Sequence, residues 1–172
     1  MRFLLSLFTV SILVAAGPLS NRRAPGFSLM DSSGKQFDIQ DYRGKVVLVD
    51  IMLTNCPHCR TFTKVLDRVM ARYGGRVMVL SVVNPPDNAA SVSQFLKDLK
   101  PASPILFDCG QMAISYLKVT PQNPSVDVPH LFIIDGNGWI VSDYGYGDDT
   151  KNIFEGSALF TELDLILAAK KK

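Results

Sequence analysis

The chain has 172 residues, of which 47% are hydrophobic and 20% are charged, and its formal net charge at pH 7 is +2. This length is enough for one domain with a full hydrophobic core. The basic residues cluster only at Lys170-Lys171-Lys172, which argues against a nucleic-acid partner.

Residues 1–16 have the layout of a secretory signal peptide. Arg2 precedes an apolar run from Phe3 to Val14, and small residues follow up to Ala16. We predict cleavage after Ala16, which leaves residues 17–24 as a linker and residues 25–169 as the folded domain. A buried N-terminal helix or strand is the alternative. The expected location is the periplasm or another extracytoplasmic space, where disulfide chemistry operates.

The first half of the predicted domain contains a hairpin, a buried strand and a helix. Residues 27–42 form two alternating segments around the turn sequence 31–35, which predicts a β-hairpin. The apolar run 46–53 predicts a buried strand that ends shortly before a Cys-Pro-His-Cys sequence. Residues 60–73 then carry apolar side chains at helical spacing, at Phe62, Val65, Leu66, Val69 and Met70.

The second half alternates strands and helices and closes with a hairpin and a helix. We predict strands over residues 76–83 and 105–107 and a short helix over 111–117. A further amphipathic helix has its apolar face at Val92, Phe95, Leu96 and Leu99. A hairpin follows over residues 131–142, and the closing helix has its apolar face at Leu159, Phe160, Leu163, Ile166 and Leu167. This order predicts an α/β fold with a mixed sheet covered on both faces.

Cys56 and Cys59 lie where the buried strand passes into the first helix. Thiolates are stabilised at a helix N-terminus by unpaired N–H groups and the macrodipole, and Pro57 suits the first helical turn. A structural zinc site would need two further ligands, for which the chain offers only Cys109, His58 and His130. A structural disulfide would close a loop too short to stabilise the fold much. A redox-active dithiol is therefore the preferred interpretation.

Two stretches, FSLMDSSGKQFDIQDYRGKVVLVDIMLTNCPHCR and VPHLFIIDGNGWIV, resemble the thioredoxin superfamily. Within it, the chain is similar to the exported TlpA/ResA-like (redoxin) thiol–disulfide oxidoreductases over residues 25–168. The resemblance implies a thioredoxin-like three-layer α/β/α fold with a central mixed sheet, an N-terminal β-hairpin and an extra strand–helix insertion. It also implies an enzyme whose redox centre is the Cys56–Cys59 disulfide, without another cofactor. We expect a monomer that acts on protein dithiols or disulfides and exchanges electrons with a membrane or soluble thiol partner.

The resemblance also assigns residues around the cysteines. Val128-Pro129 falls where the superfamily has a cis-proline that presents its backbone to an incoming peptide; the alternative is a trans turn proline. Asp50 matches a buried acid that can shuttle the proton of Cys59 if burial raises its pKa. The alternative is an outward-pointing side chain. His130, directly after Pro129, is expected near the dithiol and is predicted to take part in substrate binding.

Some positions depart from the family pattern. Met52 and Asn55 stand where thioredoxins usually have an aromatic residue and a tryptophan, so Asn55 is predicted to take part in substrate binding. Pro57-His58 resembles the dipeptide of the oxidising DsbA, and His58 can stabilise the Cys56 thiolate. The ResA-like body instead suggests a reductase, so the direction of electron flow stays open.

The mechanism that follows divides the roles of the two cysteines. Cys56, at the exposed helix start, is expected to attack and form a mixed disulfide, which the more buried Cys59 resolves. The third cysteine, Cys109, is expected to be a buried small hydrophobe, with a second resolving or peroxide-sensing thiol as the alternative.

Two other functions remain open from the sequence. Cys56, Cys59 and His130 resemble the soft ligand set of Sco-type copper chaperones, although those proteins space their cysteines by three residues. Peroxiredoxins share the scaffold but have a threonine three residues before the reactive cysteine. Here Leu53 stands at that place and Thr54 comes one residue too late.

Overall fold

The computed structural model describes residues 17–122, 124 and 127–169, so the predicted signal peptide lies outside the described residues. The strands are β1 (Arg22–Arg23), β2 (Ser28–Asp31), β3 (Gln36–Asp38), β4 (Val46–Met52), β5 (Val77–Val83), β6 (Ile105–Phe107), β7 (His130–Ile134) and β8 (Trp139–Gly145). The α-helices are α1 (Pro57–Tyr73), α2 (Ala89–Leu99), α3 (Gln111–Leu117), α4 (Lys151–Phe154) and α5 (Ser157–Ala169). No described helix is long and apolar enough to cross a membrane.

These strands form one mixed sheet in the order β1-β8-β7-β4-β5-β6-β2-β3. The central strand β4 runs parallel to β5 and antiparallel to β7, and all seven of its residues are buried. A strand with neighbours on both sides and helices on both faces is buried in this way, which explains its continuous apolar sequence. The dithiol therefore follows a fully buried central strand.

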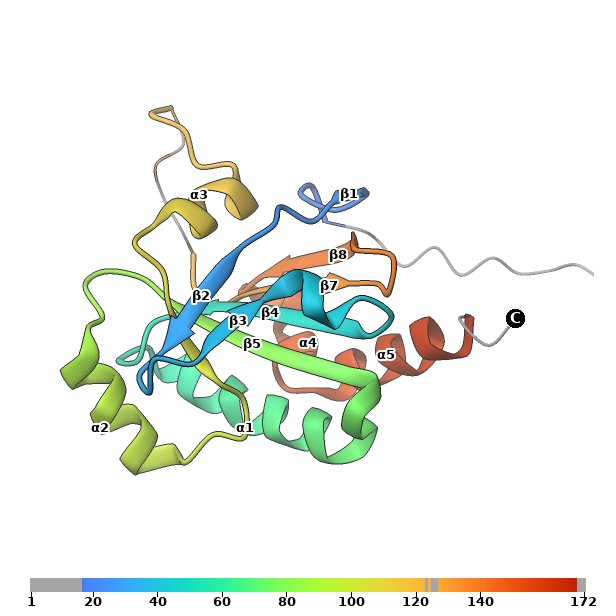
Figure 1. Cartoon of the computed structure of the whole chain (residues 1–172). Coiled ribbons are helices and arrows are strands. Elements are labelled where there is room, and N and C mark those ends of the chain that lie inside the picture. The colour runs from blue at the N-terminus through green and yellow to red at the C-terminus, as the bar shows by residue number, and fades with distance from the viewer. Residues whose placement is uncertain (1–16, 123, 125–126, 170–172) are drawn as a thin grey trace, which may run out of the picture.

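Helices cover both faces of the sheet (Figure 1). On one face, α1, α4 and α5 pack on alternate residues of the central strands, including Leu48, Val79 and Leu131. The helix α2 extends this layer beside α1 and packs on Met52 through Phe95. On the other face, α3 packs on the intervening residues of β4, β5 and β7. Side chains of successive strand residues point to opposite faces, so Asp50 belongs to the α1 face and Ile51 to the α3 face.

The structure confirms the predicted three-layer thioredoxin-like fold, with its N-terminal hairpin β2–β3 and the inserted elements α2 and β6. Two features were not anticipated. Arg22–Arg23, inside the predicted linker, form the edge strand β1 against β8. The hairpin joins the sheet through β2, which pairs with the inserted strand β6.

The prediction that Cys109 is buried is wrong, because its side chain is exposed. The preceding residue, Asp108, takes the inward position after β6. Its carboxylate accepts hydrogen bonds from the backbone N–H groups of Met112 and Ala113, at 3.2 and 2.9 Å, and so fixes the start of α3. The need to satisfy these N–H groups turns Asp108 inward and leaves Cys109 outside.

Candidate active site

Cys56 is the N-cap residue of α1, and Pro57 follows at the first position of the helix. The Cys56 Sγ accepts a hydrogen bond from the backbone N–H of Cys59 at 3.3 Å. On its other side, this sulfur lies 3.8 Å from the carbonyl oxygen of Val128. A thiolate at this place is stabilised by a backbone donor and by the helix dipole, and it is partly open to solvent.

Cys59 has a contrasting environment, because its side chain is fully buried. It packs in an apolar cluster with Met52, Val92 and Phe95, which joins α1, α2 and the end of β4. This burial raises the pKa of the Cys59 thiol, and a hydrogen bond with Cys56 and the nearby charge of Asp50 raise it further. Both cysteines are free thiols in the structure. Cys56, which we expected to attack, is therefore the more accessible thiol, and Cys59, which we expected to resolve the mixed disulfide, is the buried one.

The predicted cis-proline is confirmed, since the Val128–Pro129 peptide bond is cis. This bond lies directly before β7, which begins at His130. The Val128 carbonyl faces Cys56, and the Pro129 carbonyl accepts a hydrogen bond from the backbone N–H of Tyr146 at 3.2 Å. This segment therefore links the dithiol to the end of β8.

Tyr146 is a site residue that the sequence analysis missed. Its ring stacks on the exposed His58 ring, with centroids 4.1 Å apart and an angle of 24° between the planes. On its other side it makes an edge contact with Phe154 of α4, at 5.4 Å. This stack positions His58, which forms no hydrogen bond with Cys56 within the described residues. The only sequence signal was an aromatic residue after the last strand, which does not reveal its contact with His58.

Asp50 is fully buried on the face of β4 that packs against α1. Among the described residues, neither of its carboxylate oxygens has a hydrogen-bond partner. Ser81 lies opposite it on β5, but the Ser81 hydroxyl is 3.3 Å from that of Ser103. Burial raises the pKa of Asp50 from 3.8 to about 7, although the nearby Ser81 hydroxyl acts in the opposite direction. The structure therefore places an inward-pointing acid, able to gain or lose a proton near neutral pH, within electrostatic range of Cys59.

The loop before Cys56 is held by the inserted segment. The backbone N–H of Thr54 donates to the Asp87 carboxylate at 2.8 Å, and the Thr54 hydroxyl donates to the same carboxylate. Arg60 donates to the Thr54 carbonyl at 3.2 Å and forms an ion pair with Asp98 of α2 at 3.0 Å. The connection from β5 through α2 thus braces both ends of the Cys-Pro-His-Cys segment, and Asn55 is left exposed between them.

His130 lies on the α3 face of the sheet. It pairs in register with Ile51, whereas Asp50 points to the α1 face. Its ring stacks on Phe132 at 4.7 Å, and its Nε2 atom is 3.6 Å from Asp143. The described residues contain no group of three or more His, Cys, Asp and Glu side chains that could hold a metal ion. The roles predicted for His130 and Asn55 in substrate binding stay predictions.

Solved structures of known proteins have the same fold. The thioredoxin domain of a thiol–disulfide oxidoreductase from Bacteroides vulgatus matches with a TM-score of 0.63 and 23% identity, over 79% of this chain and 95% of that one. The exposed lipoprotein thioredoxin from Streptococcus pneumoniae matches with a TM-score of 0.61 and 23% identity, over 78% of this chain and 98% of that one. Fold, dithiol and cis-proline define a thioredoxin-like thiol–disulfide oxidoreductase.

The model of the AhpC/TSA family matches residues 21–142, so the chain belongs to this family. Among curated proteins, the thiol–disulfide oxidoreductase ResA from Bacillus cereus is 25% identical over 135 residues, which are 78% of this chain and 74% of that protein. The predicted resemblance to the ResA-like branch of the superfamily is thereby confirmed.

Proposed function

We propose that this protein is an exported enzyme that exchanges disulfides with protein substrates through Cys56 and Cys59. The observation that carries the proposal is the asymmetry of the two thiols. Cys56 is accessible and receives a backbone N–H at the start of α1, whereas Cys59 is fully buried behind it. Of these two thiols, Cys56 is the one that can meet a protein disulfide first, and Cys59 is the one placed to displace the substrate afterwards.

The reaction proceeds in two exchanges. The Cys56 thiolate attacks a substrate disulfide, forms a mixed disulfide and releases one substrate thiolate. Cys59 then loses its proton and attacks the Cys56 sulfur, which forms the Cys56–Cys59 disulfide and releases the second substrate thiolate. Two electrons pass to the substrate, and the reverse sequence oxidises a substrate dithiol. Asp50 is the proposed acceptor of the Cys59 proton, because its pKa of about 7 allows it to exchange a proton at neutral pH.

The direction of electron flow follows from the reduction potential of the cysteine pair. A value near about −120 mV, as in DsbA, would make the protein a disulfide donor, and a value near about −270 mV, as in thioredoxin, a reductase. The reductase would draw electrons from a membrane or soluble thiol partner. Equilibration with glutathione, in a Cys109→Ser background, measures this potential.

An extracytoplasmic location is part of the proposal. It is supported by the signal-peptide pattern of residues 1–16 and by the similarity to a pneumococcal protein described as an exposed lipoprotein. In such a compartment the dithiol needs no further cofactor, since disulfides and thiols of other proteins supply and accept the electrons.

Trapping of mixed disulfides tests the mechanism. Cys59→Ser, in a Cys109→Ser background, should accumulate covalent adducts with extracytoplasmic proteins on non-reducing gels, and the adducts should disappear on reduction. The matched variant Cys56→Ser should accumulate few. Adducts that form with Cys56→Ser but not with Cys59→Ser would reverse the two roles, and their absence from both variants would contradict the proposed function.

The alternatives from the sequence have less support. Leu53 stands where a peroxiredoxin has its threonine, and the hydroxyl of the adjacent Thr54 is bound to Asp87. His130, required as the third ligand of a copper site, lies on the α3 face of the sheet, where its ring stacks on Phe132 and its Nε2 atom is 3.6 Å from Asp143. Peroxide consumption and Cu(I) titration of the reduced protein would measure these activities directly.

A further inference from the structure

Asp50 receives a proton in an enclosed place. Under the proposed function, it accepts the proton of Cys59 when Cys59 attacks the mixed disulfide. The Asp50 side chain is fully buried, and neither carboxylate oxygen has a hydrogen-bond partner among the described residues. Once the Cys56–Cys59 disulfide has formed, neither sulfur is a thiolate that could take the proton back. A proton that leaves Asp50 in this state therefore needs a route that avoids the two sulfurs.

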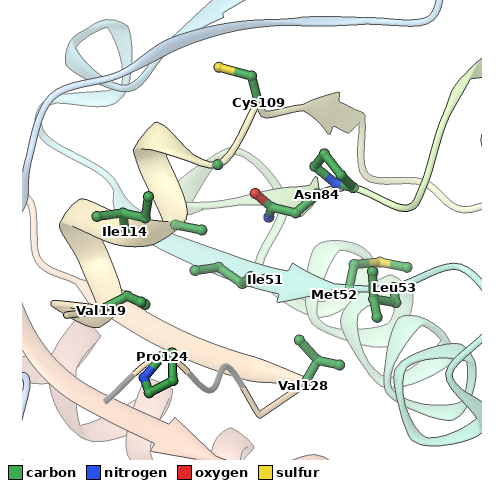
Figure 2. Close-up of a pocket in the computed structure, with 12 residues that line it drawn as sticks. Ile51, Met52, Leu53, Asn84, Cys109, Ile114, Val119, Pro124 and Val128 are labelled. Atoms are coloured by element: carbon green, nitrogen blue, oxygen red, sulfur yellow. The ribbon is translucent and has the colours of Figure 1, made fainter. Parts of the chain in front are cut away.

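Three strand neighbours of Asp50 on the same face of the sheet are apolar. Leu48 and Met52 lie two positions away on β4, Leu131 lies opposite on β7, and all three are fully buried. Ile51 points to the other face, where it lines a pocket beside α3 (Figure 2). Because successive strand residues point to opposite faces, that pocket does not give Asp50 access to solvent.

A hydroxyl group lies on the remaining side of Asp50. Strand β5 places Ser81 directly opposite it, so the two side chains share one face of the sheet. The Ser81 hydroxyl opposes the effect of burial on the pKa of Asp50, which shows that it interacts with the carboxyl. Ser81 is itself fully buried, and its hydroxyl oxygen is 3.3 Å from that of Ser103. A hydroxyl both donates and accepts, so each of these two groups can receive one proton and pass on another.

Ser103 lies between this buried pair and the protein surface. It belongs to the loop that joins α2 to β6, and the preceding residue, Ala102, is exposed. Two backbone hydrogen bonds fix the loop in place. The N–H of Ser81 donates to the Pro104 carbonyl at 3.2 Å, and the N–H of Ala102 donates to the Asp67 carboxylate of α1 at 2.8 Å. The Ser103 hydroxyl is thereby held directly beneath an exposed turn.

We propose that Ser81 and Ser103 form a proton path between Asp50 and solvent. The Asp50 carboxyl donates its proton to the Ser81 oxygen, Ser81 passes its own hydroxyl proton to Ser103, and Ser103 passes its proton to water at the loop. Both hydroxyls end neutral, Asp50 becomes a carboxylate, and the buffer takes up the released proton; the reverse sequence reloads Asp50. The inference rests on the proposed role of Asp50 as the acceptor of the Cys59 proton. Ser81 and Ser103 act through Asp50 and do not touch the substrate.

The rate at which Asp50 gains or loses its proton tests the path directly. The full-length protein, oxidised and carrying Cys109→Ser, undergoes a rapid pH jump while time-resolved infrared spectroscopy follows the carboxylic acid band of Asp50. The band is assigned by its absence from Asp50→Asn. Among the described residues, Cys59 of α1 is the titratable group whose pKa is coupled to the charge of Asp50, and the disulfide removes its titration. Ser81→Ala and Ser103→Ala should each slow the relaxation about tenfold or more, because proton transfer needs a group within hydrogen-bond reach.

Equilibrium and kinetic measurements separate a proton path from a structural role. Ser81→Ala should also raise the pKa of Asp50, because the hydroxyl that opposes the effect of burial is lost. Each relaxation is therefore measured at the midpoint of that variant's own titration. Ser103→Ala should slow the relaxation and leave the pKa of Asp50 nearly unchanged, since Ser103 contacts Ser81 and not the carboxyl. Ser81→Thr keeps a hydroxyl and should restore the native rate.

The matched control is Ser142→Ala on β8. It removes another buried hydroxyl of the sheet, one that donates to Glu162, and it should retain the native rate. Native rates in Ser81→Ala or in Ser103→Ala would overturn the path, and so would an equal slowing in Ser142→Ala. A carboxylic acid band of Asp50 that does not titrate near neutral pH would overturn it as well. Failure of Cys59→Ser to trap mixed disulfides would instead contradict the proposed function.

Discussion

The stability of Asp50→Asn relative to the native protein is expected to increase as the pH rises from 5 to 8. Burial raises the pKa of Asp50 from 3.8 to about 7. Between these pH values, the folded protein keeps a proton that the unfolded chain has lost. The contribution of this group to stability is therefore fully present below about pH 4 and is lost as the pH rises through 7.

The size of the effect follows from the shift in the pKa. A rise of the pKa from 3.8 to about 7 corresponds to about 4 kcal/mol in total. About 3 kcal/mol of this falls between pH 5 and pH 8. Asn has nearly the same shape and does not ionise, so the variant avoids this loss. The cost of its buried amide is independent of pH.

Urea unfolding of the native protein and Asp50→Asn, in reducing buffer at pH 5, 6, 7 and 8, measures this difference. The free energy of unfolding of the variant minus that of the native protein should increase by about 3 kcal/mol over the range. The contributions of other titrating groups cancel in the difference. Asp98→Asn is the control. The pKa of Asp98 is lowered by hydrogen bonds from Arg60 and Gln94, so its effect changes only in more acidic solution. A constant difference for Asp50→Asn would refute desolvation as the dominant influence on this carboxyl.

Two further predictions concern the surroundings of the dithiol. Tyr146→Ala removes the ring that stacks on His58 and should make the reduction potential of the Cys56–Cys59 pair more negative by about 30 mV. Tyr146→Phe should retain the native potential. Equal potentials in all three proteins would exclude a role for the stack. Asp87→Ala removes both hydrogen bonds that Thr54 donates and should lower the free energy of unfolding by about 2 kcal/mol in urea titrations. A loss below about 0.5 kcal/mol would show that these two hydrogen bonds contribute little to stability.

Local sequence patterns predicted where the two cysteines of the candidate site lie in the fold. The continuous apolar run of β4, the helical spacing that follows it and Pro57 placed Cys56 and Cys59 at a helix start, because these features depend on residues close in sequence. The resemblance to a known superfamily added Pro129 and Asp50, and the structure confirms the cis bond and the burial of the acid. Without that resemblance, neither role follows from local pattern.

Contacts between distant segments were decided only by the tertiary structure. Tyr146 reaches His58 because β8 ends beside Pro129, and Asp87 reaches Thr54 because β5 lies next to β4. Cys109 was expected inside because free cysteine is commonly buried, but the neighbouring Asp108 is turned inward by the N–H groups of α3. The sequence thus determined the α/β fold class through local periodicity and placed Cys56 and Cys59 at the start of a helix. Packing decided which side chains surround that pair, because their proximity arises only when the sheet assembles.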